Sequence, residues 1–278
     1  MVMWGDGLDR RVKEKAHELG ADLASLAPAV SVLDAPSHRV LTAEGWTIDG
    51  EDAGPGWPDS RVSPPRNPEG KTIVVLGLAH PRNKPELDYF SPGGNTPGNS
   101  TLLGIVRNLI RWLDTVEGVD AHSLHYAVER GGVFLKDAAV LAGLGCIGRN
   151  NLLVTPEFGP RVRLRGVLVD AELPPDSPIA FDPCVDCAGY CRVACPRYAL
   201  NDAVEFSAVD DLEGRPARDG HYKRSRCMLQ MNEDQSMVAT SEAGDDSMME
   251  RDQMDALSEY PVVHCRRCEL SCPVGSDS

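Results

Sequence analysis

The sequence predicts an α/β (α+β) layer followed by a small cysteine-rich module. Apolar strand-like runs alternate with helical patterns as far as residue 169, and this alternation is typical of an α/β layer. Eight of the nine cysteines fall between residues 184 and 272. A proline- and aspartate-rich stretch at 173–178 separates the two parts. We therefore place the domains at 1–175 and 176–278.

The first half of the layer has clear helix and strand signals. Apolar residues at helical spacing from Leu8 to Leu19 precede Gly20, which predicts a helix leading into a short strand at 21–26. The β-branched run at 73–79 predicts a buried strand. Glycine, proline and asparagine at 95–100 predict a loop before a helix at about 101–116.

The second half of the layer repeats this alternation. Strands are predicted at 122–128 and 162–169, with a helix near 134–142 between them. The helix ends in the glycine-rich turn 143–148. Such a turn brings backbone close to a neighbouring group, because glycine has no side chain to obstruct the approach.

The two cysteine runs have the spacing of iron-sulfur ligands. They read Cys184-x2-Cys187-x3-Cys191-x3-Cys195-Pro196 and Cys265-x2-Cys268-x3-Cys272-Pro273, with Cys227 between them. In bacterial ferredoxins a close cysteine triplet holds one cluster, and the cysteine before proline ligates the other. By this rule Cys272 completes the set of Cys184, Cys187 and Cys191. Cys195 and Cys227 join Cys265 and Cys268, so we predict a double-cluster bacterial ferredoxin-like module with two 4Fe-4S clusters.

Two other uses of these cysteines fit less well. A zinc site gives no reason for two Cys-Pro endings or for eight thiols in two crossed sets. Disulfides require an oxidising compartment, and the N-terminal residues lack the basic start and apolar core of a signal peptide. The first run also has three residues before Cys191 where ferredoxins usually have two, and Gly189 is the residue expected to absorb the extra length.

Composition limits the classes of partner. The chain has 278 residues, with 28 basic and 42 acidic side chains and a formal net charge of -14. Phosphate binding depends on a concentrated basic surface, so nucleic acid is not expected as a partner. No apolar stretch approaches the roughly 18 residues that cross a bilayer. We therefore expect a cytoplasmic protein with no membrane partner.

The segment VERGGVFLKDAAVLAGLGCIGRNNLLV at 128–154 resembles the core of epoxyqueuosine reductase, a family related to reductive dehalogenases. The stretches at 155–160 and 19–22 also resemble that family. The resemblance implies a nitroreductase-like and cobalamin-chaperone-like fold for the layer, with cobalamin bound beside the first cluster. It also implies that a low-potential donor of ferredoxin or flavodoxin type supplies electrons, while a side-chain acid supplies a proton to the substrate.

The chain departs from that family at several positions. Glu129 stands where the family has its catalytic aspartate, Gly132 replaces a proline, Leu135 replaces an acid and Cys146 replaces a tryptophan. The chain also ends six residues after Cys272, so the helical-repeat extension that helps some members hold transfer RNA is absent from it. Together with the acidic charge, these departures predict a sibling subfamily that reduces a small-molecule substrate.

The resemblance and the local sequence give two sets of candidate site residues. Glu129 is the candidate general acid, since burial in a cofactor cavity would raise its pKa and keep it protonated; the alternative is a surface glutamate paired with Arg130. The candidate cofactor-binding residues all belong to the glycine-rich turn: Gly143, Gly145, Cys146, Gly148 and Asn150. For Cys146 the alternative is a small buried filler.

Two further functions stay open at this point. The chain is also compatible with a ferredoxin-type electron-transfer or corrinoid-handling protein that has no substrate of its own. A flavin in place of cobalamin would give a flavin-dependent reductase. The glycine-rich turn favours a bound cofactor, whereas the altered acid and its neighbours favour lost or changed chemistry.

Overall fold

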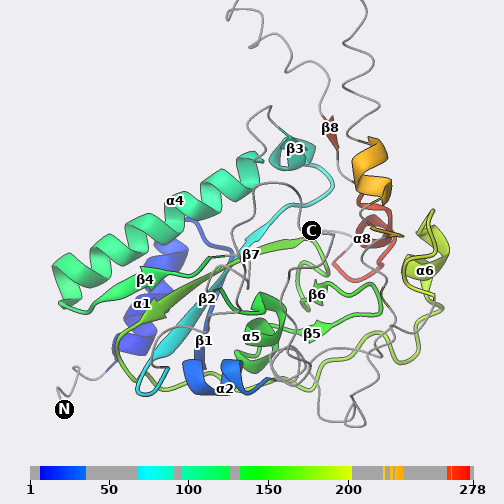
Figure 1. Cartoon of the computed structure of the whole chain (residues 1–278). Coiled ribbons are helices and arrows are strands. Elements are labelled where there is room, and N and C mark those ends of the chain that lie inside the picture. The colour runs from blue at the N-terminus through cyan, green and yellow to red at the C-terminus, as the bar shows by residue number, and fades with distance from the viewer. Residues whose placement is uncertain are drawn as a thin grey trace, which may run out of the picture.

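A four-stranded antiparallel sheet forms the centre of the protein in a computed structural model (Figure 1). The structure describes residues 7–35, 68–90, 96–125, 132–201, 222, 226–227, 229–234, 262–263 and 265–275. The strand order is β1-β2-β7-β4, formed by Leu23–Pro28, Thr72–Ala79, Val162–Val169 and Ala121–Ser123. The long central pair β2 and β7 is in register from Thr72 opposite Val169 to Ala79 opposite Val162.

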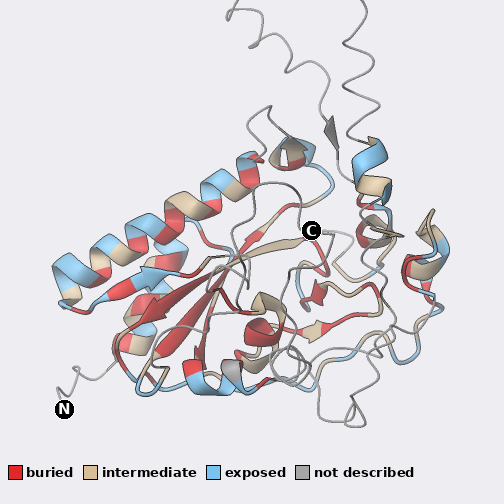
Figure 2. Ribbon diagram, in the orientation of Figure 1, coloured by how far each residue is buried: buried red, intermediate tan, exposed pale blue. Residues whose placement is uncertain are grey.

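Helices cover both faces of this sheet, because the side chains of β2 alternate between two apolar cores. Val74 and Leu76 face a core that includes helices α1 (Leu8–Glu18) and α4 (Pro97–Trp112). Ile73 and Val75 face a second core with α2 (Ala29–Leu33) and α5 (Leu135–Leu141). Alternate residues of a strand point to opposite faces, so one buried strand supports both layers. Figure 2 shows the resulting buried band through the sheet. The predicted mixed α/β layer is confirmed.

Smaller elements connect the layer to the cysteine-rich part. Helix α4 continues as a π-helical turn, η2 (Leu113–Glu117). The 3-10 turn η1 (Pro85–Asp88) leads into β3 (Tyr89–Phe90), which pairs with β8 (Val262–Val263) just before the second cysteine run. A hairpin of β5 (Cys146–Ile147) and β6 (Leu153–Val154) follows α5. The cysteine-rich part itself contains the one-turn helices α6 (Tyr190–Ala194) and α8 (Arg267–Leu270).

The predicted boundary at 173–178 is attached to the layer by several hydrogen bonds. The Asp176 carboxylate accepts from Lys13 Nζ at 2.8 Å, from Ser25 Oγ at 2.7 Å and from the Leu26 amide at 2.9 Å. The Asp176 amide in turn donates to the Leu26 carbonyl at 3.0 Å. This attachment fixes the direction in which the chain leaves the layer towards the first cysteine run. The two-domain division stays a prediction.

In the part of the chain that the structure describes, no helix is both long enough and apolar enough to cross a bilayer.

Candidate iron-sulfur site

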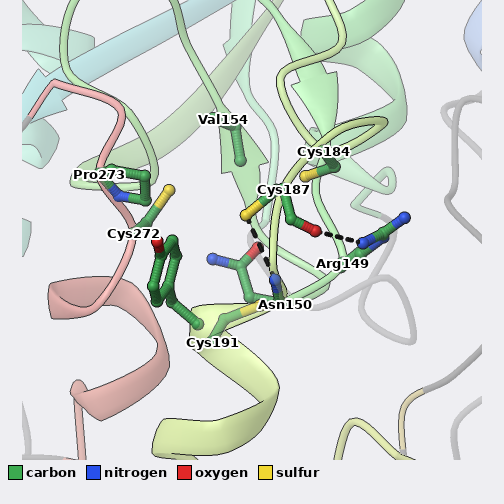
Figure 3. Close-up of a pocket in the computed structure, with 10 residues that line it drawn as sticks. Arg149, Asn150, Val154, Cys184, Cys187, Cys191, Cys272 and Pro273 are labelled. Atoms are coloured by element: carbon green, nitrogen blue, oxygen red, sulfur yellow. Dashed lines mark hydrogen bonds between the residues drawn. The ribbon is translucent and has the colours of Figure 1, made fainter.

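Four of the cysteines line one pocket (Figure 3). Three of them, Cys184, Cys187 and Cys191, come from the first run, and Cys272 comes from the end of the second. We call these four residues the first cysteine group. The structure thus places Cys272 beside the triplet, as the ferredoxin rule predicts, although it does not test whether the four thiols bind a cluster.

The backbone around the first group is shaped to present the thiols. The Cys184 amide donates to Asp182 Oδ1 at 3.0 Å, and Arg149 Nη1 donates to the Cys187 carbonyl at 2.9 Å. Gly189 precedes α6 with a φ of 77°, a left-handed conformation that glycine adopts readily. Its amide donates to the sulfur of Cys187 at 3.4 Å. Hydrogen bonds of this kind orient cluster ligands and tune their electronic properties.

We call the other four cysteines, Cys195, Cys227, Cys265 and Cys268, the second cysteine group. Burial is the largest cause that raises the pKa of Cys268, to about 12, and the charges of Cys227, Cys265, Glu269 and Cys195 add to it. The Cys268 thiol therefore lies within electrostatic reach of the other three. The Ala199 amide donates to the Cys195 sulfur at 3.3 Å, so this group also includes an N–H···S bond.

The two groups share the helices α6 and α8. Cys191 lies in α6 and belongs to the first group, whereas Cys195 follows the same helix directly and belongs to the second. Cys268 lies in α8 and belongs to the second group, whereas Cys272 follows that helix and belongs to the first. Each cysteine run consequently contributes to both groups.

The buried thiols hold their protons more tightly than free cysteine. Burial raises the pKa of Cys191 to about 11, and the charges of Cys184, Cys187 and Cys272 contribute to the same shift. The pKa of Cys272 is also raised, first by burial. Metal binding requires thiolates, so loading of this site must release protons.

The first cysteine group offers four thiols around one pocket, and a 4Fe-4S cubane, which four cysteines ligate, fits that donor set. Among the described residues, no three His, Cys, Asp or Glu side chains are arranged to hold a single metal ion.

A buried ion network joins the second group to the α/β layer. Arg266, next to Cys265, donates to the carboxylates of Asp88 and Glu269 and, at 2.8 Å, to the His80 carbonyl. Asp88 also accepts from Arg163 of β7 and lies 2.9 Å from His80 Nδ1. Burial raises the pKa of Asp88, but its contacts with His80, Arg163 and Arg266 outweigh that effect, so the pKa lies below its ordinary value.

Arg161 holds the end of the second cysteine run. Its guanidinium donates to the carbonyls of Glu269, Cys272 and Val274 at 3.4, 3.5 and 2.5 Å. Burial lowers the pKa of Arg161, and the Cys272 thiolate opposes that shift. Neither Arg161 nor the Asp88 network could be found from the sequence, because nothing local in the sequence marks contacts between residues more than 70 positions apart.

The glycine-rich turn lies next to the first group, but its glycines have different surroundings. A Cβ on Gly148 would lie 3.6 Å from the Cys184 sulfur, and Asn150 lines the cysteine pocket. At Gly143 and Gly145 a Cβ would overlap the carbonyl oxygens of Ser177 and Val154. The space that these two glycines leave is thus filled by the chain's own backbone.

The remaining predicted site residues are Cys146 and Glu129. Cys146 begins β5, pairs with Val154 and is half-buried, so it lies in the hairpin next to the first group. Glu129 lies outside the residues that the structure describes. Its predicted role as the acid is therefore untested.

Comparison with curated proteins finds two kinds of reductase. The tetrachloroethene reductive dehalogenase of Desulfitobacterium hafniense is 48% identical over 65 residues, which are 23% of this chain and 12% of the relative. The epoxyqueuosine reductase of Synechococcus sp. (strain RCC307) is 27% identical over 209 residues, 69% of this chain and 60% of the relative. The epoxyqueuosine reductase of Lactococcus garvieae is 28% identical over 145 residues, which are 48% of this chain and 41% of the relative. No family model matches the chain.

Comparison with solved structures extends the similarity over almost the whole chain. The epoxyqueuosine reductase from Streptococcus thermophilus superposes with a TM-score of 0.60 at 21% identity, covering 97% of this chain and 66% of its own. The chain is epoxyqueuosine reductase-like in sequence and in fold. An epoxyqueuosine reductase solved with a tRNA-Tyr epoxyqueuosine-modified stem loop has a TM-score of 0.59 at 19% identity, covering 96% and 65%.

The epoxyqueuosine reductase-like chain is shorter than all of these proteins. It spans between 12% and 60% of the three curated relatives and about two thirds of the two solved structures. The relatives are reductases, and one of them was solved with a tRNA stem loop. The comparisons therefore leave nucleic acid open as a partner, in spite of the acidic charge.

Proposed function

We propose that this chain is an iron-sulfur reductase of the epoxyqueuosine reductase-like type, in which two 4Fe-4S clusters deliver electrons to a bound cobalamin and then to a small organic substrate. The single observation that carries the proposal is that Cys272 of the second run lines one pocket with Cys184, Cys187 and Cys191 of the first. A ligand that crosses from one run to the other in this way is the ferredoxin arrangement for two clusters.

The residues present fit the proposed clusters. The first group lines a pocket with four thiols. In each group a backbone amide donates to one sulfur: the Gly189 amide to the Cys187 sulfur, and the Ala199 amide to the Cys195 sulfur. Arg149 and Asp182 form hydrogen bonds with the backbone of Cys187 and Cys184, so the chain itself fixes the backbone that carries these two thiols. Such preorganisation is what a redox site needs to keep its geometry during electron transfer.

The cobalamin part of the proposal is supported by similarity alone. Cobalamin, when bound, supplies a low-valent cobalt that is a strong reductant. In this chain Gly148 and Asn150 lie at the cysteine pocket, whereas Gly143 and Gly145 are packed against backbone. We assign no catalytic step to these residues. Glu129 is the proposed proton donor to the substrate, and Glu129→Gln should abolish turnover while leaving the iron content unchanged.

Anaerobic reconstitution tests the cysteine groups. The wild-type protein should hold about eight irons, because two four-iron clusters require them, and single variants of either group should hold about four. The crossing itself is tested by comparing spectra of one-cluster variants. Under the proposal, Cys272→Ser loses the same cluster as Cys184→Ser, so the electron paramagnetic resonance spectra of the reduced proteins should match.

The same experiment has a matched pair and a control. Cys195→Ser should match Cys265→Ser, and Cys146→Ser should keep both clusters. If Cys272→Ser instead matched Cys265→Ser, the two runs would hold one cluster each and the crossed grouping would be wrong. A protein that binds no iron would remove the redox function altogether.

An electron carrier is the second candidate function. The backbone packing at Gly143 and Gly145 favours it, because the turn is tightly filled at these two positions. Titration of the loaded protein with cobalamin and with flavin separates the candidates. A shifted corrinoid or flavin absorption band supports the reductase, whereas eight irons with no binding of either compound supports the carrier. Assays with a small halogenated or epoxide compound and with tRNA then distinguish the substrate classes.

A further inference from the structure

Arg161 is a cation enclosed by protein, and only 1% of its surface is exposed. It stands directly before β7, so the central sheet fixes its backbone. Its three hydrogen bonds go to the carbonyls of Glu269, Cys272 and Val274. These partners are neutral, and all of them belong to the segment that carries the last ligand of the first cysteine group.

In the described part of the chain, no carboxylate forms an ion pair with Arg161, and its Nε has no hydrogen-bond partner. The charge of Glu269 acts on Arg161, but the Glu269 carboxylate is bound by Arg266 at 2.9 Å. Arginine stays protonated in proteins, and a buried charge is costly unless an opposite charge compensates it. An anion held close to Cys272 would supply that compensation.

We propose that Arg161 is the buried counter-charge of the first cysteine group and raises the reduction potential of the cluster bound there. This inference rests on the proposed function, because it needs a cluster at Cys184, Cys187, Cys191 and Cys272. A cluster held by four thiolates is anionic and gains one negative charge when it accepts an electron. A fixed cation in a low-dielectric site stabilises the reduced form more than the oxidised form, so it raises the potential.

Arginine also suits this place because of its geometry. The planar guanidinium reaches three carbonyls around the Cys272 turn at once, so the cation is held rigidly beside the ligand. Gly159 and Gly275, which flank the same region, leave no room for side chains, and the enclosure keeps water away from the charge. An exposed cation would be screened by solvent and salt, whereas this one is not.

A redox titration of the reconstituted protein tests the inference without any turnover. Dithionite supplies single electrons, and the reduced first cluster is followed by electron paramagnetic resonance at fixed potentials. In Arg161→Gln the ratio of reduced to oxidised cluster at a given potential should fall about tenfold, which corresponds to about 59 mV for one electron. Arg161→Lys retains the charge and should stay within about threefold of the wild type.

A charge-matched control separates this effect from a change in net charge. Arg165 lies within β7, four positions after Arg161, and hydrogen-bonds to Asn99 and to the Leu164 carbonyl, so Arg165→Gln removes one positive charge at a different place. It should leave the potential of the first cluster unchanged. If Arg161→Gln cannot be loaded but Arg161→Lys loads with the wild-type potential, the charge itself is what the site requires.

Other results would overturn the inference. Equal shifts in Arg161→Gln and Arg161→Lys, or failure of both variants to load, would show that the guanidinium acts by shaping the Cys272 turn. An unchanged potential in loaded Arg161→Gln would show that the charge has no redox role, while the proposed function would stand. A wild-type protein without iron at the first group would remove the proposed function and this inference together.

Discussion

Replacing Asp88 by asparagine tests how strongly the cysteine-rich part is bound to the α/β layer. Asp88 is 2% exposed and is the carboxylate shared by Arg163 of the layer and Arg266 of the second cysteine run. Asparagine has almost the same shape but carries no charge. The substitution therefore leaves two guanidinium groups, one of them buried, with Glu269 as the remaining carboxylate partner of Arg266.

The size of the effect follows from the burial of these groups. Removing one partner of a buried ion pair costs about 3–5 kcal/mol, because the other charge is left uncompensated. The asparagine carbonyl still accepts a hydrogen bond, and Arg163 keeps 25% of its side chain exposed, so we expect the lower end, about 3 kcal/mol. This is a large fraction of the roughly 5–15 kcal/mol that stabilises a folded domain.

Urea unfolding under anaerobic conditions measures the change, with iron retention as a second readout. Asp88→Asn should lower the unfolding midpoint and speed the loss of iron, since the second cysteine group loses its attachment at Arg266. Asp170→Asn is the matched control: this carboxylate pairs with Lys71 and is 32% exposed, so its loss should cost about 0–1 kcal/mol. If the two variants proved equally stable, the network would not be what joins the two parts.

Two further predictions concern the Cys272 turn and the linker. In Gly159→Ala the new Cβ overlaps the Val274 carbonyl at a φ of 58°, so the variant should lose iron from the first group. The control Gly70→Ala has a similar φ of 67° but open space around the new Cβ, so it should cost only about 1–2 kcal/mol of stability. Equal iron contents in the two variants would contradict the reasoning. Burial raises the pKa of Asp176 but the hydrogen bond from Lys13 and further contacts outweigh it, so the net shift is downward. A lowered pKa stabilises the fold above the unfolded value of about 3.9 and loses that contribution as the pH falls through the folded value. The difference in urea midpoint between the wild type and Asp176→Asn should therefore shrink from pH 5 to pH 2, and a constant difference would refute the assignment.

The long elements could be predicted from the sequence because their patterns are strong. The run at 73–79 is observed as Thr72–Ala79, and the strand predicted at 162–169 has the same bounds in the structure. Helix α4 begins earlier than predicted, at Pro97, because Thr96 caps it by accepting from the Asn99 amide at 3.2 Å. The Thr-Pro pair is a known start signal, so this boundary could have been found.

Short elements and long-range contacts could not be predicted in the same way. The two-residue strands β3, β5, β6 and β8 are too short to show an alternation, and α2 has five residues, too few for a helical period. The strand predicted at 122–128 is observed as Ala121–Ser123, and residues 126–128 lie outside the described part of the chain. The place of Cys272 beside Cys184, Cys187 and Cys191 was predictable because the ferredoxin rule needs only the spacing, whereas the positions of Arg161 and Asp88 depend on the fold.

The helices α6 and α8 explain why the two cysteine groups should act together. Three residues lie between Cys191 and Cys195, and three between Cys268 and Cys272. In each pair the first cysteine lies in the helix and the second follows the end of that helix. Each helix, together with the residues that follow it, thus carries one thiol of each group, and the two helices contact each other. If both proposed clusters are bound, electrons would pass from the second group to the first through these two neighbouring helices. A higher potential at the first group, which we attribute to Arg161, would draw electrons towards Gly148 and Asn150, the part of the glycine-rich turn where similarity predicts the acceptor.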